Sequence, residues 1–121
     1  MVRIEQYISE FSGSVLSPWS ALAPWQLVAH APQIVSELLK GLSAEEYEIV
    51  DDIAVHRTAV VEAGAVLKGP LIIGAHCFVA SGAYLRGGCW VDERCIFGPG
   101  AELKTSFVFR GSKLAHFNFV G

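Results

Sequence analysis

The sequence has few charged residues and no long apolar run. Only 17% of its 121 residues are charged, against 52% that are apolar, yet no uninterrupted apolar stretch reaches the roughly 20 residues that a membrane-spanning helix needs. The amino terminus lacks the basic start and the small-residue cleavage site of a secretory signal. These absences predict a cytoplasmic protein. The length of the chain predicts one domain with a small extension.

Basic clusters and metal-binding cysteine pairs are also missing. The nine Lys and Arg are scattered and the net charge is −3, so the chain lacks the basic patch that nucleic-acid binding requires. The three cysteines form neither an even set for disulfides nor a Cys-x-x-Cys pair for zinc. We therefore expect no nucleic-acid partner, no membrane partner and no metal site.

What the sequence does contain is a repeat of six residues. Every sixth position is apolar in the series Val55, Val61, Leu67, Ile73, Val79, Leu85, Val91, Phe97, Leu103, Phe109 and Ala115. The position four residues further is mostly small, in the series Ala59, Ala65, Leu71, Cys77, Ala83, Cys89, Cys95, Ala101, Phe107, Lys113 and Phe119. Three hexapeptides make one coil of a triangular solenoid, with the apolar residue inside and the small residue at the corner.

Glycines fall between the apolar positions, where tight corners need them. They are Gly64, Gly69, Gly82, Gly87, Gly88, Gly98, Gly100 and Gly111. An antiparallel sandwich would instead place turns about every 8 to 12 residues. The sequence therefore predicts an all-β fold, a left-handed parallel β-helix over residues 51–121.

Residues 1–50 show a helical period instead and are predicted to be a short α-helical cap. A helix is expected from Pro32 to Lys40, because proline suits a first turn and Gly41 the residue past the last. Ser43 and Glu46 have the spacing of a capping box for one further turn. We expect this region to cover the apolar surface and unpaired strand edges of the first coil.

The tryptophans of the extension and the cysteines of the repeat have structural explanations. Trp19 and Trp25 are expected to dock on the first coil or on a neighbouring subunit. Cys77, Cys89 and Cys95 all fall on the small corner position, so we expect them to be packing residues, because a reactive thiol needs exposure and an activating neighbour.

Residues eighteen apart stack vertically in such a solenoid, which turns the sequence into approximate positions. Lys68, Arg86 and Lys104 form one column near a corner, about two strand spacings long. This column can bind a phosphate group. Stacked charges at an exposed corner can also serve only to keep the edge soluble.

His116 holds the same hexapeptide position in a different column, above Glu62, Ala80 and Gly98. A threefold assembly could bring it to the basic column of a neighbouring chain. His56 and His76 are expected to be turn or surface residues, and Phe78, Tyr84 and Trp90 to pack between subunits.

Two parts of the repeat carry a family resemblance. Ala101–Lys104 and the string from Gly111 to Gly121, which reads GSKLAHFNFVG, resemble the start of the acetyltransferase domain in bifunctional glucosamine-1-phosphate acetyltransferase/N-acetylglucosamine-1-phosphate uridyltransferases. Thr58–Val61 and Ala83–Gly88 are similar to the β-helix tails of sugar-1-phosphate nucleotidylyltransferases.

The resemblance implies a trimeric acetyltransferase that uses acetyl-CoA and belongs with the enzymes of UDP-N-acetylglucosamine biosynthesis. His116 matches the general base that takes a proton from the sugar's amino group as the amine attacks the thioester. Arg86 and Lys104 match residues that hold the sugar phosphate. Phe119 stands where the family has a tyrosine that contacts the ligand.

The chain stops at Gly121, where the family continues with coils that bind acetyl-CoA. We therefore expect a fragment of a longer protein, a second chain stacked on this end, or a member that has lost catalysis. The alternative function is a non-catalytic trimerisation or ligand-binding scaffold with a degenerate site.

Overall fold

The hexapeptides form short strands of two to four residues each. The computed structural model describes residues 29–114 and 119–120. The elements are α3 (Ala31–Lys40), β1 (Tyr47–Val50), β2 (Ile53–His56), β3 (Val60–Val61), β4 (Val66–Leu67), β5 (Leu71–Ile73), β6 (Phe78–Val79), β7 (Tyr84–Arg86), β8 (Cys89–Val91), β9 (Ile96–Phe97), β10 (Glu102–Lys104), β11 (Phe107–Val108), β12 (Lys113–Leu114) and β13 (Phe119–Val120).

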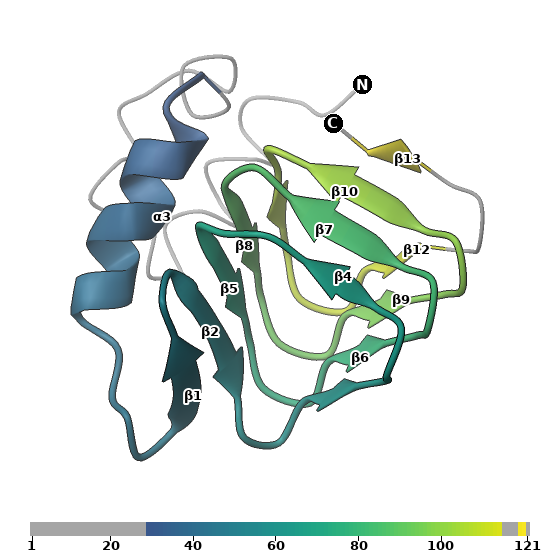
Figure 1. The fold of residues 1–121 in the computed structure, drawn as a ribbon, viewed down its shortest axis with the longest axis horizontal. Coiled ribbons are helices and arrows are strands. Elements are labelled where there is room, and N and C mark those ends of the chain that lie inside the picture. Colours follow the sequence, from purple (N-terminus) through teal and green to yellow (C-terminus); the bar gives the residue numbers. More distant parts are fainter. Residues whose placement is uncertain (1–28, 115–118, 121) are drawn as a thin grey trace.

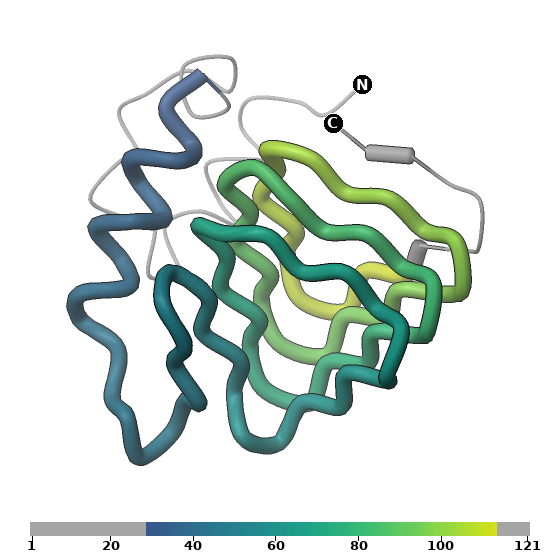
Figure 2. Tube along the Cα trace, in the orientation of Figure 1, coloured from purple at the N-terminus to yellow at the C-terminus, as the bar shows by residue number. Residues whose placement is uncertain are grey.

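These strands stack into three sheets around a triangular interior (Figure 1). Sheet A has the order β1-β2-β5-β8-β11, sheet B has β3-β6-β9-β12, and sheet C has β4-β7-β10-β13. Neighbours in each sheet are parallel, except that β1 runs antiparallel to β2. The coils follow one another in Figure 2, and the predicted left-handed parallel β-helix is confirmed.

Successive coils are in register at a spacing of eighteen residues as far as Lys104. On sheet C, Lys104 lies beside Arg86, as the period predicted. On sheet B, Phe97 lies beside Val79 in the same way. This register aligns the inward side chains of one coil with those of the next.

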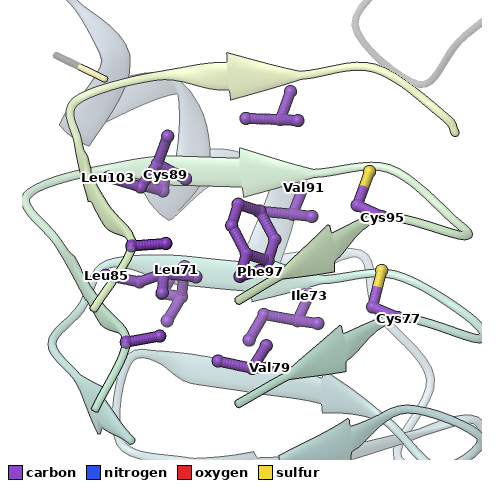
Figure 3. Packing of buried hydrophobic residues seen from close by; sticks show 13 residues of the cluster. Leu71, Ile73, Cys77, Val79, Leu85, Cys89, Val91, Cys95, Phe97 and Leu103 are labelled. Atoms are coloured by element: carbon purple, nitrogen blue, oxygen red, sulfur yellow. The ribbon is translucent and has the colours of Figure 1, made fainter. Parts of the chain in front are cut away.

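The inward side chains form a dry apolar core (Figure 3). Leu71, Ile73, Val79, Leu85, Val91, Phe97 and Leu103 have no exposed surface. Burying such a side chain stabilises a fold by about 1.5–3 kcal/mol, so the repeat positions supply the main favourable term. Val55, Val61 and Leu67 of the first coil are only partly buried against this core.

The register shortens by one residue at Thr105. In the register of the strands, Ser106 lies opposite Cys89, so Thr105 alone takes the place of Gly87 and Gly88 of the coil before. Thr105 has a φ of 48°, and its hydroxyl donates a hydrogen bond to the Gly87 carbonyl at 2.9 Å. The threonine thus closes the tighter corner with its own side chain.

The shorter corner turns the following strand over. Val108 pairs with Val91 and belongs to the interior cluster. Phe109, which the period places inside, packs outside against Trp90, with ring centroids 5.8 Å apart. The prediction for Phe109 is wrong because a one-residue slip moves each strand residue to the opposite face. The prediction for Ala115 lies outside the described residues.

The sequence held a signal for this slip. Apart from Leu71, the small corner position is occupied by large residues only near the end of the series, at Phe107, Lys113 and Phe119. One residue earlier, the sequence has Ser106, Ser112 and Asn118. The pairing of Lys113 with Ile96 and of Phe119 with Glu102 follows the shortened register.

The predicted helix is confirmed, since α3 spans Ala31–Lys40 with proline in its first turn. Gly41 follows it and donates its N–H to the Leu38 carbonyl at 3.1 Å. A single turn follows Ser43, whose carbonyl accepts the N–H groups of Glu46 at 3.2 Å and Tyr47 at 2.9 Å, but no reciprocal capping box forms. Instead, the Ser43 hydroxyl accepts the Glu45 N–H at 3.1 Å, and the turn leads directly into β1.

Helix α3 covers the outer face of sheet A (Figure 1). Ile34 and Val35 of the helix pack against Ala54, Ile72 and Trp90, which form a second apolar cluster. Trp90 is 5% exposed, so it packs within this chain and not between subunits as we expected. The helix therefore caps a face of the solenoid.

Gly88 allows the helix to approach the solenoid closely. Its φ is +89°, and a Cβ at this position would lie 2.7 Å from the Pro32 nitrogen. A side chain would therefore displace the first turn of α3.

The edge of β2 at the start of the solenoid is covered by β1, through four antiparallel residue pairs from Tyr47↔His56 to Val50↔Ile53. Residues 47–50 thus extend sheet A, although the sequence placed them with the helical extension. The boundary at residue 50 stays a prediction. In the described part of the chain, no helix is long and apolar enough to cross a membrane.

We predict that Leu85→Ala lowers the free energy of unfolding by about 2–5 kcal/mol, because it leaves a cavity in the fully buried interior. Ile49→Ala is the control, since Ile49 is 39% exposed on β1 and its loss should cost less than about 1 kcal/mol. Denaturant unfolding followed by circular dichroism measures both. Equal losses would contradict the assignment of Leu85 to the core.

Candidate functional site

The three basic residues of the predicted column lie in line at the carboxyl ends of the strands of sheet C. They are here called the basic strip (Lys68, Arg86 and Lys104). Lys104 pairs directly with Arg86 across the parallel strands β10 and β7. The N–H of Lys68 donates to the Leu85 carbonyl at 2.8 Å, which places Lys68 in the coil next to Arg86. Strands in a sheet are about 4.8 Å apart, so the three backbone positions form a short row.

Tyr84 and Glu102 lie beside the strip on the same outer face. The Lys68 Nζ is 5.3 Å and the Arg86 Cζ is 5.6 Å from the centre of the Tyr84 ring. The Arg86 Nη2 is 3.8 Å from the Glu102 Oε1, and both side chains are about two-fifths exposed. The aromatic ring and the carboxylate therefore hold Arg86 over sheet C.

Lys104 is the most available cation of the strip. Its side chain is exposed, and it takes part in none of the ion pairs found among the described residues. In the corner beyond it, the Ser106 hydroxyl donates to the Lys104 carbonyl at 2.7 Å. An anion that approaches this corner meets Lys104 first, and Arg86 only in competition with Glu102.

The sequence missed Tyr84 and Glu102 as neighbours of the strip. Each precedes a basic residue by two positions. Residues two apart on a strand point to the same face. The spacing was therefore a usable signal, although the ion pair also depends on the side-chain conformations of Arg86 and Glu102.

His116 lies outside the described residues, so its assignment as a base stays a prediction. Its expected column above Gly98 relied on the eighteen-residue spacing, which the structure follows only as far as Lys104. Phe119 begins β13, and its backbone pairs with Glu102 of β10. The strand that contains Phe119 is thus next to the strand that ends at Lys104.

The cysteines are packing residues, as predicted. All three are buried, and each thiol donates to a backbone carbonyl: Cys77 to Asp92 at 3.0 Å, Cys89 to Arg86 at 3.1 Å and Cys95 to Phe109 at 3.4 Å. Burial raises the pKa of Cys89. The pKa of Cys95 is raised by its hydrogen bond with Cys77 and by burial. Both changes oppose thiolate formation at Cys89 and Cys95, whereas the hydrogen bond with Cys95 lowers the pKa of the buried Cys77.

The two histidines expected in turns differ. His76 is an exposed turn residue with a φ of 58°, and its N–H donates to Thr58 Oγ1 at 3.0 Å. His56 belongs to strand β2 and packs edge-on against Tyr47, with ring centroids 5.0 Å apart. The prediction of a turn or surface residue is therefore confirmed for His76 as a turn residue, and His56 is a partly exposed strand residue at the surface.

Comparison with known proteins supports the repeat. Residues 70–105 match the family model described as bacterial transferase hexapeptide (six repeats). The match covers β5 to β10 and contains Arg86 and Lys104, and it ends at Thr105, where the register shortens. No curated protein matches the chain. The chain thus contains a hexapeptide-repeat segment, while the string from Gly111 to Gly121 lies outside the match.

We predict that Glu102→Gln strengthens the binding of inorganic phosphate by about two- to fivefold, because the carboxylate that competes for Arg86 is removed. Calorimetric titration measures the change. Glu37→Gln is the control, since Glu37 is also exposed and ion-paired, to Lys40 at 2.9 Å on α3. Unchanged or weaker phosphate binding in the Glu102 variant would contradict an anion site on the basic strip.

Proposed function

We propose that this chain forms the β-helix of an acyltransferase that moves an acetyl group from acetyl-CoA to an amino-sugar phosphate or a nucleotide sugar. The observation that carries the proposal is the alignment of Arg86 and Lys104 in adjacent strands, inside the segment that matches the transferase hexapeptide model. The resemblance of the string from Gly111 to Gly121 supplies the acetyl donor and the class of acceptor.

A phosphate group fits the end of the basic strip. Phosphate binds cations that can reach its oxygens from different sides, and arginine offers two parallel donors. Arg86 and Lys104 start from adjacent backbone positions, so both side chains can reach one phosphate. Arg86 would then exchange Glu102 for the phosphate, which lowers the net gain in binding.

His116 is proposed as the base. It would accept a proton from the acceptor amine as the nitrogen attacks the thioester carbonyl carbon. The carbon–sulfur bond then breaks and the same proton passes to the leaving sulfur, so the products are an amide and free CoA. In the sequence, His116 falls between β12 and β13, and β13 returns to the edge of β10.

The test is an assay of acetyl transfer from acetyl-CoA to glucosamine 1-phosphate, in which the released CoA thiol is measured. We predict that His116→Ala lowers the turnover of the protein by about 100-fold or more, as expected when a general base is removed. His76→Ala is the control, because His76 is an exposed turn residue. Equal turnover in the His116 variant and the original protein would rule out the proposed base.

The rival proposal is a scaffold that binds ligands or assembles subunits without catalysis. It is favoured by the contacts of Arg86, whose guanidinium already lies near Glu102 and Tyr84. A trimer that binds neither acetyl-CoA nor a uridine-diphosphate amino sugar in calorimetric titrations would support this rival against the transferase.

A homotrimer is proposed from an apolar column on the outer face of sheet B. Val60, Phe78 and Ile96 lie in register on β3, β6 and β9. Their exposed fractions are 54%, 37% and 40%, although all three are large and apolar. A vertical row of exposed apolar side chains is typical of a surface that packs against another chain. In a ring of three copies, each sheet B would face its neighbour.

We predict that Phe78→Glu converts the trimer into a monomer, because it places a charge at the centre of the apolar column. Light scattering measures the mass in solution. Ile49→Glu is the control, since Ile49 is similarly exposed, at 39%, but lies on β1 of sheet A. A Phe78 variant with the mass of a trimer would show that subunits do not associate through sheet B.

A further inference from the structure

A groove of about 620 Å³ lies where the end of α3 meets sheet A. It is bounded by Leu38 of the helix, the turn from Gly41 to Glu46, Tyr47 of β1 and the strands β2, β5 and β8. Its volume is in the range of sites for small organic molecules. The basic strip lies on sheet C, so the groove is a separate feature of the surface.

The walls of the groove are apolar and aromatic. Leu38 and Leu42 line it from the helix side, and Ile72 and Trp90 line it from sheet A. These four residues belong to the cluster between the helix and the sheet. Tyr47 adds a second aromatic ring and is half-buried. Ile72 and Trp90 are only 2% and 5% exposed, so the apolar surface that a ligand can cover comes mainly from Leu38, Leu42 and Tyr47.

The charges of the groove have one sign. Glu46, Asp92 and Glu93 line it, and among the described residues no lysine or arginine does, although Arg57 donates to the Ala44 carbonyl of the bounding turn at 2.8 Å. Asp92 is partly neutralised by Arg110, whose Nε is 3.4 Å from the Asp92 Oδ2. Burial raises the pKa of Tyr47, and the negative charges of Glu46 and Asp92 raise it further. The same field that opposes a tyrosinate favours a bound cation.

The remaining titratable group in the groove is His56. Its Nδ1 lies 2.8 Å from the Thr58 hydroxyl oxygen and accepts the Thr58 N–H at 3.2 Å. Because Thr58 Oγ1 already accepts the His76 N–H, the hydroxyl is free to donate to Nδ1. A ring that accepts both hydrogen bonds at Nδ1 has its proton on Nε2.

We infer that this groove binds a small organic cation, with its ammonium group near the carboxylates of Glu46 and Glu93 and its apolar body against Tyr47 and Leu42. Carboxylates and aromatic rings together are the groups that recognise organic ammonium ions in proteins. Phosphate or carboxylate ligands are repelled by the same residues. This site goes beyond the proposed transfer reaction and does not depend on it.

The test is calorimetric titration with 2-phenylethylammonium, compared with 3-phenylpropionate, an anion with the same apolar body. We expect the cation to bind and the anion to bind at least about fivefold more weakly. Glu46→Gln and Glu93→Gln should each weaken binding of the cation by about two- to fivefold.

Glu102→Gln is the matched control, because Glu102 lies on sheet C, away from the groove, and should leave cation binding unchanged. His116→Ala should also bind the cation normally, which separates failure of this inference from failure of the transferase. The inference is overturned if the anion binds as tightly as the cation, if neither carboxylate variant changes the affinity, or if the original protein does not bind the cation.

Discussion

The backbone of each coil is hydrogen-bonded to the next coil, and this ladder sets where every side chain of the solenoid lies. Val66 donates its N–H to Ala83 at 2.9 Å, and Tyr84 donates to Ala101 at 2.8 Å. Because the strands are parallel and short, inward residues stack on inward residues and outward residues on outward residues. The interior core and the basic strip are therefore two results of one register.

The same ladder makes the corners important. When a corner is one residue shorter, a strand of two or three residues is too short to compensate for the loss. All later residues therefore move by one position. Thr105 takes the place of Gly87 and Gly88, and Val108 then occupies the interior while Phe109 lies outside. The hydroxyl of Thr105 bonds to the Gly87 carbonyl, which stabilises the shorter path.

The three faces of the solenoid differ although they are built from one repeat. Sheet A is covered by α3, which makes its outer face as apolar as a core and leaves the groove at the end of the helix. Sheet B exposes the apolar column around Phe78. Sheet C exposes charged side chains, among them Arg86 and Lys104. The outward residues, which the fold leaves free to vary, thus give each face a different chemistry.

The sequence by itself determined the β-helix, the helix from Pro32 to Lys40, the packing role of the cysteines and the alignment of the basic strip. Each follows from a local period or spacing, which the chain carries in its order of residues. Only the tertiary structure decided the shortened corner at Thr105, the docking of α3 on Trp90, and the contacts of Arg86 with Glu102 and Tyr84. These depend on which surfaces meet and which side-chain conformations result, and a repeat of six residues does not specify either.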